Sequence, residues 1–162
     1  MNAPDIHNIR IFQKLGRVTV ASVETCDQLL LILPSKPGAV HFKALPQGSK
    51  LQQVLRKSPT GANPALLTRM TNKRQTLVVG GTLSKDATAF ERLTLGRKLV
   101  REATRPKAGS LGICVVGFDK AETQLIYNDM IAAALAAAFE MTIFKSLKYP
   151  PVIRSISLLG LD

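Results

Sequence analysis

The sequence has no tryptophan and only 5% aromatic residues, so a hydrophobic core must be built from aliphatic side chains. Hydrophobic residues still make up 46% of its 162 residues, enough for one domain with a sizeable core. The two cysteines, Cys26 and Cys114, are too few for a disulfide framework. We interpret Cys114, inside the apolar run LGICVVGF, as a small buried hydrophobe and Cys26 as a free thiol. This cysteine usage indicates a reducing, cytoplasmic compartment.

Long hydrophobic runs are also missing. The longest apolar stretch, MIAAALAAAF at 130–139, falls well short of the about 20 residues that a membrane helix needs. The opening stretch MNAPDIHNIR has no apolar core of the kind found in signal peptides. We therefore expect a cytoplasmic protein with no membrane partner.

Histidine is scarce, with only His7 and His41 in the chain. Neither histidine belongs to a recognisable Ser/His/Asp or Cys/His arrangement. The acidic residues are scattered singly, without the spacing of a metal cage. We expect no catalytic residue, no cofactor and no metal site in this chain.

Acidic residues are absent between Asp27 and Asp86, and the whole chain carries a net charge of +11 with a pI of about 10.1. The cations of this stretch have no counter-charge nearby in the sequence, so they are available to an external anion: Lys36, Lys43, Lys50, Arg56, Lys57, Arg69, Lys73, Arg74 and Lys85. Such a balance points to nucleic acid, an anionic surface or an acidic partner domain.

Two local groups of cations are the candidate nucleic-acid contacts. Arg97, Arg101 and Arg105 lie at i+4 spacing on one predicted helix, with Lys98 beside them, and form a basic ridge; its candidate contacts are Arg97, Lys98 and Arg101. The second group, Lys73 and Arg74, lies in a predicted hairpin turn. The ridge could equally be a solvated helix face, or could dock on an acidic domain. Because aromatic residues are few, any nucleic acid would be held through its phosphates with little sequence preference.

The hydrophobic patterns predict an α/β fold, with a mixed, partly parallel sheet flanked by helices. The two longest helices are expected at 84–105 and 122–144, and Ser84 is expected to cap the first of them. We expect a further helix at 49–58, and strands at 17–25 and 28–33 (paired as a hairpin), 65–70 and 75–81 (joined by the turn TNKR), 111–118 and 151–159.

Glycines mark two further positions. Gly80 and Gly81 precede the helix at 84–105, so they could cradle a phosphate or could simply form a tight strand-to-helix turn. Gly96 lies in the apolar stripe of that helix, which also contains Ala89, Leu93, Val100 and Ala103 and is widened by Phe90 and Leu99. A glycine there predicts close approach of the helix to the sheet.

Three segments carry a resemblance to a known family. They are LVVGG at 77–81 followed by LGRKLVREA at 95–103, GICVVGFD at 112–119, and ALAAAFEMTIFKSL at 134–147. Together they resemble the N-terminal, non-catalytic domain of the leucyl aminopeptidase (cytosol aminopeptidase) family. That domain is similar in fold to the macro domain, which binds ADP-ribose in other proteins, so the resemblance implies a macro-domain-like fold.

The resemblance also implies a function. Family members remove N-terminal residues from peptides with two divalent metals, zinc or manganese, held in a C-terminal catalytic domain with a signature close to NTDAEGR. No such string occurs here, so no catalytic residue is carried over. We expect residues 1–162 to form a single accessory domain with the catalytic domain absent, serving oligomerisation, access or nucleic-acid contact.

The partners implied are the catalytic domain of the same polypeptide, further copies in a homo-oligomer, and non-specific DNA. The alternative is a free-standing basic α/β module that binds nucleic acid or a nucleotide. Whether the chain belongs to an enzyme stays open between these two hypotheses.

Overall fold

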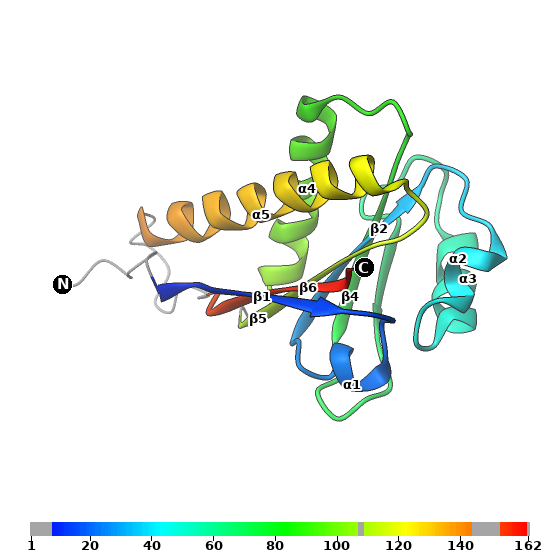
Figure 1. The fold of residues 1–162 in the computed structure, drawn as a ribbon, viewed down its shortest axis with the longest axis horizontal. Helices are drawn as coiled ribbons and strands as arrows, with labels where there is room; N and C mark the ends of the chain where they lie inside the picture. Colours follow the sequence, from blue (N-terminus) through cyan, green and yellow to red (C-terminus); the bar gives the residue numbers. More distant parts are fainter. Residues whose placement is uncertain (1–7, 107–108, 144–152, 162) are drawn as a thin grey trace.

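A six-stranded sheet forms the centre of the computed structural model, which describes residues 8–106, 109–143 and 153–161. Its strand order is β1-β6-β5-β2-β4-β3 (Figure 1), and only β3 runs antiparallel to its neighbour. The strands are β1 (Arg10–Leu15), β2 (Gln28–Pro34), β3 (Leu66–Arg69), β4 (Leu77–Leu83), β5 (Ser110–Val115) and β6 (Ser155–Leu161). The expected mixed α/β fold is confirmed, and it is compatible with a macro-domain-like architecture.

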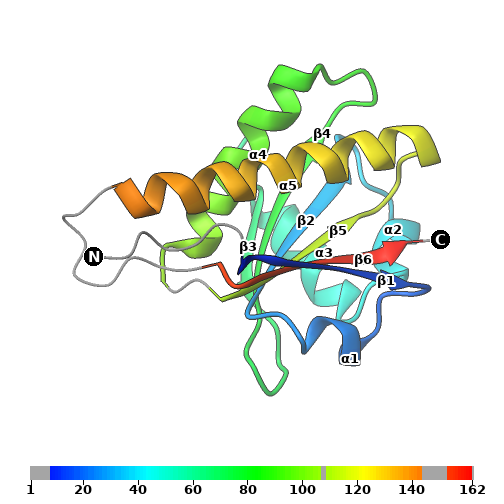
Figure 2. The ribbon, with the colours of Figure 1, turned by 60° about the vertical axis from the view of Figure 1, so that its left-hand side comes forward.

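Helices cover both faces of the sheet (Figures 1 and 2). Helices α4 (Ala89–Thr104) and α5 (Lys120–Ile143) cross one face, and α1 (Val20–Val23), α2 (Ala39–Lys43) and α3 (Gly48–Lys57) lie on the other. Among the described elements α4 and α5 are the longest helices, with 16 and 24 residues, as expected. The helix expected at 49–58 is confirmed as α3.

The core consists of two layers separated by the sheet. Leu30 and Ile32 of β2 pack toward α4 and α5, whereas Leu29 and Leu31 pack toward α1–α3. Every residue of β2 is buried, because this strand lies between β4 and β5 and is covered on both faces. Each such side chain contributes about 1.5–3 kcal/mol relative to leaving it exposed, so the apolar run QLLLIL anchors both layers.

The first part of the chain differs from expectation. The strand expected at 17–25 is wrong, because Thr19 caps the short helix α1: its Oγ accepts from the Ser22 backbone N–H at 3.2 Å, and the Ser22 hydroxyl accepts from the Thr19 N–H at 2.9 Å. Thr19 and Ser22, two of the polar residues whose alternation with apolar residues predicted a strand, therefore serve to cap a helix. The expected hairpin is also wrong, since β2 pairs in parallel with β4 and β5.

Strand β1 was not expected from the sequence. Among the described strands it pairs with β6 alone, in parallel, and most of its side chains are exposed on both faces of the sheet edge. An edge strand of this kind has neither a continuous apolar run nor a clean alternation, so periodicity does not mark it.

The remaining boundaries shift for local reasons. Helix α4 begins after Thr88 instead of Ser84, because Thr88 and Glu91 form a reciprocal capping box with bonds of 2.6 and 3.2 Å. Phe90 is consequently 77% exposed and does not widen the apolar stripe. Strand β5 ends at Val115, and Gly117 beyond it has a φ of 89°. The hairpin of β3 and β4 is confirmed.

Gly96 permits close packing of two helices, whereas the sequence suggested contact with the sheet. A methyl group at Gly96 would lie 2.9 Å from the Ala133 Cβ and 3.1 Å from the Met130 Cε, both on α5. The Ala-rich stretch of α5 thus meets the one position of α4 that has no side chain. The two helices cross at a distance that larger side chains would not allow.

We predict that Gly96→Leu lowers the free energy of unfolding by about 1–3 kcal/mol through overpacking, even though leucine favours helices by about 1 kcal/mol relative to glycine. Ala132→Leu is the matched control, because Ala132 is exposed on α5 and should change stability by less than about 0.5 kcal/mol. Urea denaturation of the three proteins measures both effects. Equal stability of Gly96→Leu and the parent chain would contradict the packing described.

Candidate functional site

The basic ridge of α4, defined as Arg97, Lys98 and Arg101, lies on the solvent side of the helix. All three side chains are exposed, and Leu95, Gly96, Leu99, Val100 and Ala103 face the core on the opposite side. At about 100° per residue these cations fall on one continuous strip. Within the part of the chain that the structure describes, none of the three makes a salt bridge. The helix therefore presents them together to solvent.

The turn between β3 and β4 is a separate surface. It lies beside the end of α1, on the opposite side of the sheet from α4 (Figures 1 and 2). Lys73 is exposed there. The structure therefore does not bring Lys73 and Arg74 together with the ridge.

Arg74 has structural partners in this turn. Its guanidinium Nη1 donates to the Thr25 carbonyl at 3.3 Å and the Ser110 hydroxyl at 3.2 Å, and lies 3.4 Å from the Asp27 carboxylate. The side chain ties the start of β4 to the starts of β2 and β5. The Nη1 atom of Arg74 is thus engaged within the protein, while the side chain stays 47% exposed.

Asp27, noted from the sequence only as the acidic residue before the acid-free stretch, is the centre of this arrangement. Its carboxylate accepts from both the backbone N–H and the hydroxyl of Ser110, each at 3.1 Å. In return the Asp27 N–H donates to the Ser110 carbonyl at 2.9 Å. The last acidic residue before the long basic stretch is therefore a structural acceptor that joins β2 to β5.

We predict that Asp27→Ala lowers the free energy of unfolding by about 1.5–3 kcal/mol, because the donors of Ser110 lose a charged acceptor. Arg74→Ala should cost only about 0–1 kcal/mol, since the ion pair is 47% exposed at Arg74 and 25% exposed at Asp27. Lys73→Ala is the neighbouring control and should be neutral. A cost for Arg74→Ala as large as that for Asp27→Ala, measured by urea denaturation, would contradict this ranking.

Gly80 and Gly81 do not form a phosphate cradle. Both lie inside β4, well before the start of α4, and both are buried. A methyl group at Gly81 would come within 2.7 Å of the Leu95 side chain, and one at Gly80 within 2.9 Å of the Leu66 Cβ. These glycines let α4 and β3 pack closely on the sheet, so the phosphate interpretation is wrong.

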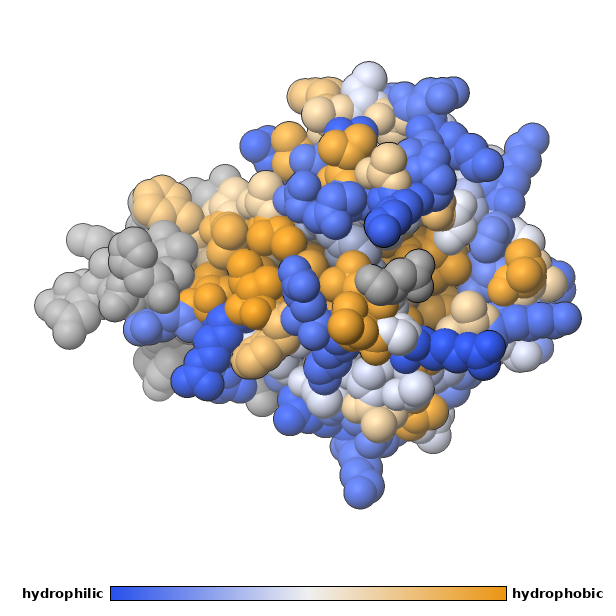
Figure 3. Space-filling view, viewed as in Figure 1, coloured by the Kyte–Doolittle hydropathy of each residue, from blue (hydrophilic) through white to orange (hydrophobic). Residues whose placement is uncertain are grey.

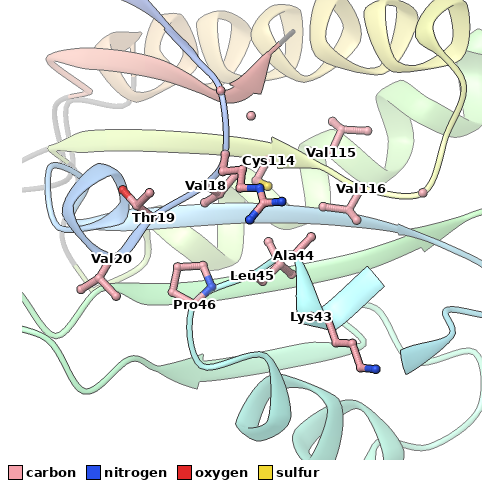
Figure 4. Close-up of a pocket in the computed structure, with 14 residues that line it drawn as sticks. Val18, Thr19, Val20, Lys43, Ala44, Leu45, Pro46, Cys114, Val115 and Val116 are labelled. Carbon is pink, nitrogen blue, oxygen red and sulfur yellow. The ribbon is translucent and has the colours of Figure 1, made fainter. Parts of the chain in front are cut away.

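A cavity of about 870 Å³ lies at the carboxyl ends of the parallel strands (Figure 4) and was missed by sequence reasoning. Apolar side chains from three segments line it: Val18 from the β1–α1 loop, Leu45 after α2, and Val116 after β5. Arg17 and Lys43 are its charged lining residues. An apolar cavity of this size with a few charged groups is typical of small-molecule sites.

Cys114 lines the cavity but acts as a hydrophobe. Burial raises the pKa of its thiol to about 12, so the thiol stays protonated at neutral pH and is not a nucleophile. Burial also raises the pKa of Cys26, despite a hydrogen bond with Thr25. Both cysteines are free and buried, as expected for Cys114.

Metal ligands do not gather anywhere in residues 8–106, 109–143 or 153–161: no group of three His, Cys, Asp or Glu side chains is placed to hold an ion. The Nδ1 of His41 accepts from the Gly38 N–H at 3.0 Å and so completes the start of α2. His7 lies outside the described residues. None of the described helices is both long and apolar enough to span a bilayer.

Comparison with known proteins gives a structural likeness without a sequence likeness. No family model matches the chain, and no curated protein matches it. Fifteen chains of solved structures match. One is a mutant of tomato leucine aminopeptidase, which superposes with a TM-score of 0.57 at 16% sequence identity.

The extent of this match is uneven. It covers 99% of the present chain but 34% of the tomato protein, so the chain spans about a third of the length of the enzyme that it resembles. At this identity the likeness concerns the fold alone. The chain folds like one part of a leucine aminopeptidase chain.

Proposed function

We propose that this chain is an accessory domain of a leucyl aminopeptidase-like metallopeptidase, acting in the cytoplasm. The observation that carries the proposal is the superposition on 34% of a leucine aminopeptidase chain along nearly the whole length of this one. The peptide bond would be cleaved by a catalytic domain that holds two divalent metals, zinc or manganese. The present residues would serve assembly with that domain and with further copies.

An exposed apolar surface supports a role in assembly. Apolar side chains gather over α5 and the adjoining sheet edge in the view of Figure 3. The exposed large hydrophobic residues of these elements include Ile11 and Phe12 of β1, whose side chains point to opposite faces of the sheet edge, and Phe139 of α5. Apolar side chains gathered on a surface are typical of protein interfaces. We assign this surface to contact with the remainder of a longer aminopeptidase-like polypeptide.

Nucleic-acid contact is the second role that we propose, and the ridge of α4 supports it. Arg97, Lys98 and Arg101 lie side by side, exposed, and without a salt bridge to another described residue. Lys73 and Arg74 could add contacts only from a separate surface, and Arg74 is already engaged with Asp27. The ridge would bind phosphates of the backbone and read little sequence.

We predict that the isolated chain does not hydrolyse leucine p-nitroanilide, with or without added Mn²⁺ or Zn²⁺. Such enzymes activate water at an open two-metal site, and the sequence shows no ligand set for one. Metal-dependent turnover by the pure chain that disappears when residues of this chain are substituted would contradict the accessory role.

The accessory role itself is tested on the native protein. Antibodies against this chain should capture a metal-dependent leucyl aminopeptidase activity from its source, either on the same polypeptide or on a bound one. Capture of a 17.6 kDa polypeptide free of such activity would overturn the proposal and favour the free-standing module.

We predict weak binding to duplex DNA at low salt. If about four phosphates are contacted, log K should fall with log salt at a slope near −3.6, and the double variant Arg97→Ala, Arg101→Ala should reduce the slope by about 2. Fluorescence anisotropy at several salt concentrations measures the slope.

A charge-matched control is available on α3. Arg56 and Lys57 are exposed in its last turn, on the opposite face of the sheet, so Arg56→Ala with Lys57→Ala should leave the slope unchanged. Absence of DNA binding even at about 50 mM salt would contradict the nucleic-acid role and leave the ridge as a solvated helix face or a docking surface for an acidic domain.

A further inference from the structure

Three neighbouring strands end in glycines that line the same cavity. Gly16 follows β1, Gly160 lies near the end of β6, and Gly117 follows β5, with φ values of 85°, 75° and 89°. The order of the sheet places these strands side by side. In that backbone region glycine is favoured. A methyl group at Gly117 would lie 2.9 Å from the Pro34 side chain and one at Gly160 would lie 3.0 Å from the Val18 side chain, whereas at Gly16 no heavy atom lies within 4 Å. At Gly16 the rim of the cavity is thus backbone that is open to close approach by a ligand.

The charge of the cavity has one sign. Arg17 lies in the β1–α1 loop and Lys43 at the end of α2, and both are exposed. The described residues that line the cavity include no aspartate or glutamate. A ligand with a negative group is therefore favoured over a neutral or cationic one.

The apolar part of the lining determines which kind of uncharged portion, aliphatic or aromatic, a ligand can place in the cavity. Val18, Val20, Leu45 and Val116 line it with aliphatic side chains, whereas the Val115 side chain packs in the core layer of α4 and α5. No aromatic side chain of the described chain lines the cavity, so a base would have nothing to stack on. The hydroxyl of Thr19 already accepts from the Ser22 N–H. The lining suits an aliphatic body better than a nucleobase.

We infer that this cavity binds a small organic anion with an aliphatic body, its oxyanion held by Arg17 and Lys43 and its chain packed on the valines and Leu45. The carboxyl edge of parallel strands is where open α/β sheets place their ligands. The site is on the opposite face of the sheet from the α4 ridge, so it is independent of nucleic-acid binding and of the aminopeptidase assignment.

The test uses octanoate as the probe, with octanamide as its neutral isostere and octyl phosphate as the second source of an oxyanion. Titrations of the ¹⁵N-labelled chain should show saturable shifts of the Gly16, Gly117 and Gly160 amides with octanoate or octyl phosphate. Octanamide should bind at least about tenfold more weakly, because it lacks the charge-assisted hydrogen bonds. Whichever anion binds more tightly identifies the head group.

Four single variants separate the site from general charge effects. Arg17→Ala and Lys43→Ala should each weaken octanoate binding about five- to tenfold and leave octanamide unchanged. Val20→Asp adds a carboxylate to the lining and should also weaken octanoate. Phe90→Asp is its control, since Phe90 is likewise exposed in the first turn of a helix but does not line the cavity and lies on the opposite face of the sheet.

Several results would overturn the inference. They are equal binding of octanoate and octanamide, equal binding of octanoate and inorganic phosphate, tighter binding of AMP than of octanoate, shifts confined to the α4 ridge, and equal weakening by Val20→Asp and Phe90→Asp.

Discussion

The burial of β2 on both faces is the constraint on which the rest of the structure depends. Its residues pack alternately into two aliphatic layers, and its two edges pair with β4 and β5. Without tryptophan and with few aromatics, the chain obtains its core from branched and small side chains. Small residues then determine how closely the elements approach each other. Gly81 of β4 leaves room for Leu95 of α4, and Gly96 of α4 leaves room for Ala133 of α5.

The two ends of the sheet are built differently. At the amino ends of the strands, Asp27, Ser110 and Arg74 join three strands through side chains, and the Thr76 hydroxyl donates to the Cys26 carbonyl at 2.8 Å. At the carboxyl ends, Tyr127 of α5 links β5 to β6 through its hydroxyl, and a cavity opens beside the glycines that end the strands. Most of these side-chain links thus lie at the amino end of the sheet, and the cavity lies at the carboxyl end. This division is common in α/β proteins with parallel strands.

Sequence patterns predicted the elements whose environment is uniform. Strands β2 and β5 are continuous apolar runs because they are buried on both faces, and α5 is recognised by its nearly all-apolar sequence. The β3–β4 hairpin is recognised by the clear polar turn between its strands. Edge strand β1 and helix α1 were missed, because one is exposed on both faces and the other depends on a Thr19–Ser22 cap. The cavity could not be predicted, since it joins segments near residues 17, 45, 115 and 160. Charge counting likewise could not distinguish Arg74, held by Asp27, from the exposed cations of α4.

The edge strand β1 has a consequence for how the protein behaves at high concentration. It pairs with β6 on one side only, so within the described chain the backbone groups of its other side remain open to a further strand. The exposed apolar side chains of that edge, Ile11, Phe12 and Leu15, favour association with the same edge of a second copy. The positive charges of Arg10 and the nearby Arg17 oppose this association, because a second copy carries the same charges. Solubility of the protein is thus a balance between exposed apolar area and like charge. Because added salt screens the charge and leaves the apolar area unchanged, high ionic strength favours self-association through this edge.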